Sequence, residues 1–146
     1  MIKLTEEQIK EVADNLDCGL KCYYNTKTGE IKSVIDQESW LDTDMEPWEE
    51  ELAEIEENWD DYIAFDNLET HESFEIMEDF AERINDAQLQ KRVFHALNNK
   101  KPFRNFSSVI DNSGEYREQW FNYKRARYIQ EVKDQIERKN NLEDDI

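Results

Sequence analysis

A cluster of basic residues beside a proline is the part of this sequence best suited to binding chemistry. Lys100, Lys101 and Arg104 surround Pro102. That proline suits the first position of a helix, because its ring fixes φ and this position needs no amide donor. The free amides and the positive dipole end of such a helix attract anions, and the three cations add to that attraction. The pattern therefore predicts a possible surface for an anion, a nucleic acid or another partner.

The long helix predicted at the C-terminal end would extend this basic surface. The residues that would extend it are Arg117, Trp120, Lys124 and Arg127. Together with Tyr116 and Tyr123 they allow cation–aromatic and stacking contacts. We favour the alternative, in which Arg104 pairs with a carboxylate of the acidic N-terminal half and the aromatic rings are core. Lys100 and Lys101 are then expected to be exposed to solvent.

Charge is spread unevenly along the chain. Residues 1–83 carry a net charge of −20 and residues 84–146 a net charge of +2, which together give −18. The acidic half and the basic segment can neutralise each other, within one chain or between copies. The total charge also opposes association with nucleic acid at long range.

The most acidic stretch, Asp42–Asp61, has 11 acidic residues and no basic one. Within it, Trp48, Leu52, Ile55 and Trp59 are spaced as one apolar stripe of a helix, with Pro47 suited to the first helical position. We expect a helix that is buried along this stripe and solvated on its acidic side. The alternative is nucleic-acid mimicry, in which the carboxylates imitate phosphates.

Cysteines and histidines offer one candidate metal site. Cys18 and Cys22 would need His71 or His95 to complete a zinc centre. No second cysteine pair accompanies them, so we expect two free thiols and no metal. The sequence also contains no recognisable catalytic motif, phosphate loop or dinucleotide fingerprint, and we expect no catalytic residue and no cofactor.

The elements that position these residues predict an α+β fold. A Thr5–Gln8 capping box opens a first helix. Two alternating runs, Leu20–Tyr24 and Glu30–Ile35, form a hairpin, and Tyr62–Phe65 adds a third strand to a small antiparallel sheet. From Thr70, expected to cap a helix, the chain is helical.

The helical second half ends in a long helix, predicted over Glu115–Lys139. Before it, Asn85 or Asp86 caps one helix, and another begins at Pro102 with an apolar face. Phe103, Phe106, Val109 and Ile110 make up that face. We expect a single globular domain over residues 1–139 and a frayed acidic tail over residues 140–146.

The second half also resembles a known family. The resemblance rests on Met77–Phe80, on Lys101–Phe106 with the sequence KPFRNF, on Trp120, and on Tyr123–Tyr128 with the sequence YKRARY. These blocks resemble an uncharacterised protein family of small bacterial proteins. The resemblance implies a bacterial, cytoplasmic, single-domain protein. It implies no activity, cofactor or catalytic residue.

Function is therefore predicted in broad terms. We expect a non-enzymatic cytoplasmic module that binds another protein or a second copy of itself, or that acts in regulation. Neither a signal peptide nor an apolar run that could span a membrane is visible, so no membrane partner is expected. The alternatives are nucleic-acid or anion binding through Lys100–Arg104 and the last helix, mimicry by the Asp42–Asp61 face, and an enzyme built from scattered carboxylates.

Overall fold

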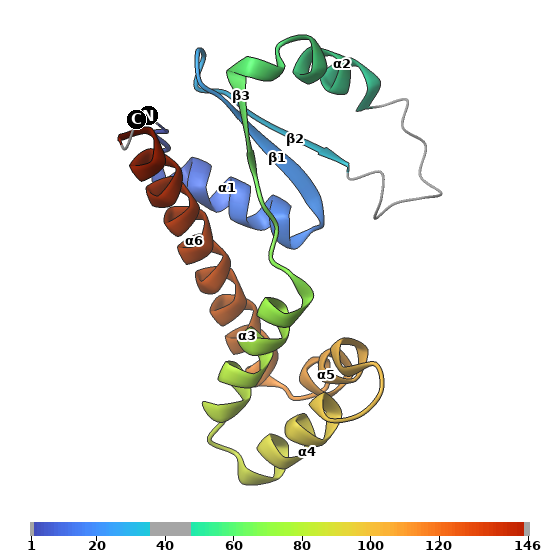
Figure 1. The fold of residues 1–146 in the computed structure, drawn as a ribbon. Coiled ribbons are helices and arrows are strands. Elements are labelled where there is room, and N and C mark those ends of the chain that lie inside the picture. Colours follow the sequence, from blue (N-terminus) through green and yellow to red (C-terminus); the bar gives the residue numbers. More distant parts are fainter. Residues whose placement is uncertain (1, 36–47, 145–146) are drawn as a thin grey trace. The chain divides into compact units, whose positions relative to one another are not determined.

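The computed structural model describes residues 2–35 and 48–144, which form two compact units. Unit 1 comprises residues 1–67 and 128–146, and unit 2 comprises residues 68–127. Figure 1 labels their helices and strands. The fold is α+β, with a small antiparallel sheet and a helical second half that ends in a long helix, as the sequence predicts. The single domain over residues 1–139 stays a prediction.

Unit 1 contains a three-stranded antiparallel sheet. Strands β1 (Leu20–Asn25) and β2 (Ile31–Ile35) form the predicted hairpin, and β3 (Tyr62–Phe65) pairs with the other edge of β1. The hairpin loop is held by the Asn25 side chain, whose Oδ1 accepts hydrogen bonds from two loop amides. Gly29 takes a φ of 77°, which few other residues adopt without strain.

Helices cover both faces of this sheet (Figure 1). Helix α1 (Glu6–Asp17) lies on the face that carries Cys22, whose Sγ is 3.9 Å from the carbonyl oxygen of Val12. Helix α2 (Glu49–Glu57) packs on the opposite face, where Tyr23, Val34 and Ile55 share one buried cluster. Sequence alternation predicts only the first apolar face. The alternation does not predict the second apolar face of the sheet, because lysines interrupt its run of apolar residues.

Helix α1 begins with the predicted capping box. The Thr5 hydroxyl oxygen accepts from the Gln8 amide at 3.1 Å, and the Gln8 side chain accepts from the Thr5 amide at 3.0 Å. Both bonds satisfy amides that the first turn of a helix would otherwise leave unpaired.

Helix α2 confirms only part of the predicted apolar stripe. Ile55 is buried, and Trp48 and Leu52 are half-buried against the same cluster. Trp59 is 59% exposed, so its assignment to the stripe is wrong. The helix ends at Glu57, because the φ and ψ of the following Asn58, −116° and 32°, are not helical. Trp59 then belongs to the 3₁₀ turn η2 (Trp59–Asp61). Pro47 lies outside the described residues.

Unit 2 is helical. It contains α3 (Thr70–Glu82), α4 (Ala87–Leu97), α5 (Pro102–Asp111) and the first turns of α6 (Glu115–Asp144). Pro102 occupies the first position of α5 as predicted, and Gly114 takes a φ of 71° before α6. Their shared core includes Ile76, Phe80, Leu89, Val93, Leu97, Phe106, Ile110 and Trp120.

Three local predictions for unit 2 have different outcomes. Asp86 caps α4, because its carboxylate accepts from the amides of the second and third helical residues. Thr70 does not cap α3; Glu69 does, and Thr70 is the first helical residue. Phe103 was expected on the apolar face of α5 but is 39% exposed, whereas Phe106 and Ile110 are buried.

Helix α6 runs through both units and continues to Asp144, beyond the predicted end at Lys139. Trp120 belongs to the core of unit 2, whereas Tyr128 and Val132 are buried in unit 1. The buried residues of this helix therefore have two different sets of neighbours, one in each unit. No helix in the described ranges is long and apolar enough to cross a bilayer.

Candidate binding groove

A groove of about 730 Å³ lies between α4 and α5 in unit 2. Each helix contributes one half-buried apolar residue, which lies next to the residues that the helix buries in the core. On α4, Val93 and Leu97 are buried in the core, and Phe94 is half-buried at the groove. On α5, Val109 is half-buried beside the fully buried Ile110. The groove therefore has an apolar floor that the core does not cover.

Asparagine side chains hold the backbone at one end of this groove. Asn105 donates through Nδ2 to the carbonyl of Lys100 at 2.7 Å, and Asn99 donates through Nδ2 to the carbonyl of His95 at 2.8 Å. Asn99 and Asn105 both line the groove. The turn from α4 to α5 is thereby fixed by side-chain bonds to backbone carbonyls that a helix end leaves unpaired.

The charges around the groove have one sign. Lys91 and Arg92 line it together with His95, and no carboxylate is among the described residues of its lining. The whole segment 87–110 contains five basic residues and no acidic one, whereas α3 contains five acidic residues and no basic one. This separation of basic and acidic residues between neighbouring segments is the feature of the sequence that indicates the groove.

The predicted basic helix start is exposed but is not part of this groove. Lys100 and Lys101 are exposed, as expected. Lys101 precedes α5 with a φ of 58°, and it is the one non-glycine residue with positive φ in the described ranges. Its side chain does not cap the helix.

Arg104 does not form the buried ion pair that we expected. Its side chain is exposed, and the described residues include no carboxylate paired with it. The reason is its place on α5. The inward stripe is filled by Phe106 and Ile110, and Arg104 is displaced from both by more than a quarter turn of the helix.

The cations predicted on α6 contact groups within unit 2. Arg117 pairs with Asp111 at 3.5 Å and lies 5.1 Å from the centre of the Phe121 ring. Lys124 lies 5.7 Å from the centre of the Trp120 ring. These contacts engage both side chains in the fold of the unit.

Arg127 makes two hydrogen bonds within unit 2. Its Nη1 donates to the Asp79 carboxylate and to the Tyr123 hydroxyl oxygen, both at 2.8 Å. The bond to Asp79 is the main cause that raises the pKa of Arg127 above its ordinary value. Both members of the ion pair are more than one-third exposed, so solvent weakens it.

Trp120 cannot serve as a stacking platform, because it is buried. It is 7% exposed, and its ring centre lies 4.8 Å from that of Phe106 and 5.3 Å from that of Phe80. Tyr116 and Tyr123 pack half-buried against the same core. The three predicted aromatic residues of this surface are therefore not free to stack on bases, and the exposed ring on α6 is that of Phe121, which is 41% exposed and lies beside Arg117 and Lys124.

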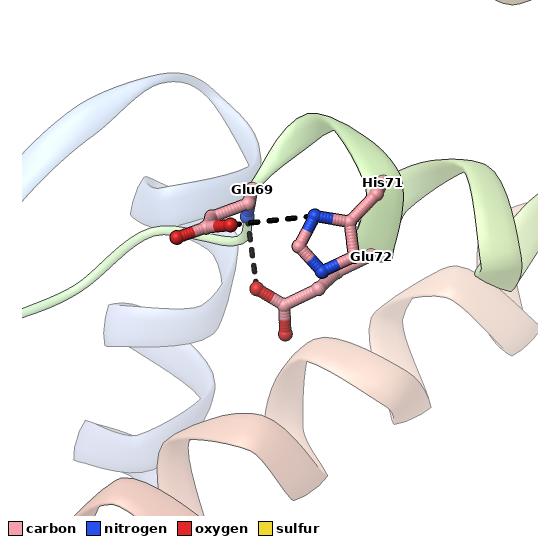
Figure 2. Close-up of side chains that lie close together, drawn as sticks. All are labelled: Glu69, His71 and Glu72. Atoms are coloured by element: carbon pink, nitrogen blue, oxygen red, sulfur yellow. Dashed lines mark hydrogen bonds and ion pairs between the residues drawn. The ribbon is translucent and has the colours of Figure 1, made fainter.

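A second cluster lies at the start of α3, where Glu69, His71 and Glu72 are drawn together (Figure 2). One ligand atom from each lies within 4.8 Å of the others. The Glu72 carboxylate accepts from the Glu69 amide at 3.1 Å, and the Glu69 carboxylate lies 3.3 Å from Nδ1 of His71. Both carboxylates form the capping box of α3. Helix capping therefore accounts for this arrangement.

The cysteines occupy different environments within unit 1. Cys18 is the exposed C-cap of α1, and Cys22 is buried on β1 with its Sγ 3.4 Å from the Ser33 hydroxyl oxygen. Burial raises the pKa of the Cys22 thiol above its ordinary value. That shift opposes the thiolate form that binds zinc.

Comparison with family models identifies the family of this chain. The model of an uncharacterised protein family (UPF0158) matches residues 2–143. No curated protein and no solved structure matches the chain.

Proposed function

Because the chain belongs to the uncharacterised protein family UPF0158, whose description names no activity, we propose a function from its geometry: it is a protein-binding module. The α4–α5 groove takes an acidic segment of a partner protein that carries at least one large apolar side chain. The observation that carries this proposal is the pairing of an uncovered apolar floor with a rim whose described residues are basic or neutral and include no carboxylate.

Each part of the groove corresponds to one property of the partner. Phe94 and Val109 supply apolar surface that an apolar side chain would remove from water. Lys91 and Arg92 supply positive charge that steers an acidic segment toward the groove and selects against basic ones.

A nucleic acid is a weaker candidate for the same surface. Its binding requires phosphate contacts by many cations and exposed rings for stacking, and the groove has two long cations and a half-buried phenylalanine. The net charge of −18 opposes its approach. A binding experiment on the groove must therefore also include a nucleic acid as a competing ligand.

The test is an anisotropy titration of the full chain with a short fluorescent peptide in which acidic residues flank one tryptophan. We expect saturable binding, and about tenfold weaker binding when Lys91→Glu and Arg92→Glu are combined. A peptide with alanine in place of the tryptophan should bind more weakly, because it leaves the apolar floor uncovered. Circular dichroism checks that each variant remains folded.

The matched control is the pair Lys100→Glu with Lys101→Glu. It makes the same change in charge at two exposed positions of the same basic segment that do not line the groove. Peptide binding should be far less affected by this pair. Equal losses from the two pairs would contradict the proposal, as would a labelled single-stranded oligonucleotide that binds the chain more tightly than the peptide does.

A further inference from the structure

Trp59 is an apolar side chain that the described fold leaves uncovered. It is 59% exposed, more than any other aromatic residue in the described ranges. Its ring meets Tyr23 edge-on, with ring centres 6.3 Å apart, so one part of the indole is held and the rest faces solvent. Tryptophan is among the residues that contribute most to binding energy at protein interfaces.

Carboxylates line a hollow together with this exposed ring. Glu56, Glu57 and Asp60 are exposed and line one hollow of about 360 Å³ together with Trp59. Asp61 lines the same hollow and pairs with Lys27 at 3.3 Å. We call Glu56, Glu57, Trp59 and Asp60 the Trp59 surface. It presents one large apolar group beside three carboxylates.

The Trp59 surface and the α4–α5 groove have complementary properties. One offers an exposed indole among carboxylates, and the other offers an apolar floor beside Lys91 and Arg92. The two surfaces belong to different units of the chain, unit 1 and unit 2. Every copy of the protein therefore carries both partners of one contact.

We propose that the α4–α5 groove of one copy binds the Trp59 surface of a second copy, with Trp59 as the apolar anchor. This inference rests on the proposed function, because it names the acidic segment that the groove takes. The contact joins two different surfaces, so it is heterologous, and each copy has one groove and one Trp59 surface left for further contacts.

The net charge of the protein determines the ionic strength at which this contact can be observed. Two copies at −18 each repel one another at long range, and at about 0.1 M salt that repulsion is screened beyond roughly 10 Å. Pairs of opposite charge that touch within the contact are screened much less. Association should therefore be measured at about this ionic strength.

The test combines sedimentation equilibrium with complementation between variants. The wild-type chain should associate in a concentration-dependent way. Trp59→Ala alone, and the pair Lys91→Glu with Arg92→Glu alone, should each weaken association at least about thirtyfold, as the loss of an interface hot spot does. Phe103→Ala removes another exposed aromatic ring and should leave association unchanged.

Mixing the two defective variants gives the most specific result. The Trp59→Ala chain keeps its groove, and the Lys91→Glu, Arg92→Glu chain keeps its Trp59 surface. The mixture should form a complex of one copy of each and nothing larger, because only one productive contact remains. Failure of the mixture to associate would overturn the inference, as would an equal loss from Phe103→Ala.

The inference and the proposed function can fail separately. A wild-type chain that stays monomeric up to about 1 mM, while it still binds the acidic tryptophan peptide, refutes self-association and leaves the groove as a site for another protein. A chain that associates but whose association is unaffected by the groove variants refutes the inference as well.

Discussion

Two tryptophans, one in each unit, differ in their exposure to solvent. Trp120 lies in the core of unit 2 between Phe80 and Phe106 and is 7% exposed. Trp59 lies on a 3₁₀ turn in unit 1 and is 59% exposed. Both follow an apolar helical spacing in the sequence, yet Trp120 is enclosed by the core of unit 2, whereas Trp59 makes an edge contact with Tyr23 and is otherwise largely exposed.

The difference shows what periodicity leaves undetermined. An apolar stripe tells which residues face the same way, and whether they are covered depends on where the helix ends and what packs against it. Helix α6 continues far beyond Trp120, so that side chain stays in register with α3 and α5. Helix α2 ends before Trp59, and the turn that follows directs it elsewhere.

The largest expected effect compares the two tryptophans directly. Trp120→Ala removes a ring that two aromatic neighbours enclose, so it should lower the free energy of unfolding by about 3–5 kcal/mol. Trp59→Ala loses one edge contact to Tyr23, and the expected cost is about 1 kcal/mol. Urea titrations followed by circular dichroism measure both. Comparable costs would show that Trp59 is covered in solution.

A second expected effect divides α2 into its two sides. Ile55 is 3% exposed, so Ile55→Ala should cost about 2–5 kcal/mol. Glu50 is exposed on the acidic side, and Glu50→Ala should change stability by no more than about 0.5 kcal/mol. The same titration distinguishes them. Similar values for both would mean that α2 does not cover the sheet as described.

The smallest expected effect concerns the ion pair between Lys32 on β2 and Glu54 on α2. The hydrogen bond from Lys32 lowers the pKa of the Glu54 carboxyl in the folded protein. Its contribution to stability is therefore present above the unfolded pKa, roughly 4.3, and is lost as pH falls through the lower folded value.

Glu54→Gln tests this pair with little change of size. The wild type should be slightly more stable than Glu54→Gln at pH 7, and the difference should shrink below pH 4 or so. Glu50→Gln is the matched control, since it removes an exposed charge from the same helix. A difference that persists unchanged at low pH would mean that the amide disrupts packing rather than the ion pair.

Local chemistry predicts much of this fold. The Thr5 capping box, the β1–β2 hairpin, the Asp86 cap and the start of α5 at Pro102 all form where their residues indicate. These features succeed because each depends on residues a few positions apart, whose hydrogen bonds and φ values are set by their own types.

The candidate site was harder to predict because it depends on distant residues. Phe94 lies beside the buried stripe of α4 and Val109 belongs to the predicted apolar face of α5, and only the packing of α4 beside α5 brings them to one groove. Arg104 was assigned a buried partner that local sequence cannot specify. The one usable signal was charge, since 24 consecutive residues from Ala87 to Ile110 contain no carboxylate.

The most direct test of the groove as a binding surface is an amide chemical-shift titration of the ¹⁵N-labelled full chain with the unlabelled acidic tryptophan peptide. We predict that the largest shift changes map to His95, Asn99, Asn105 and Ser108, which line the groove. Shift changes confined to Lys100, Lys101 and Arg104, or to the basic positions of α6, would contradict the account.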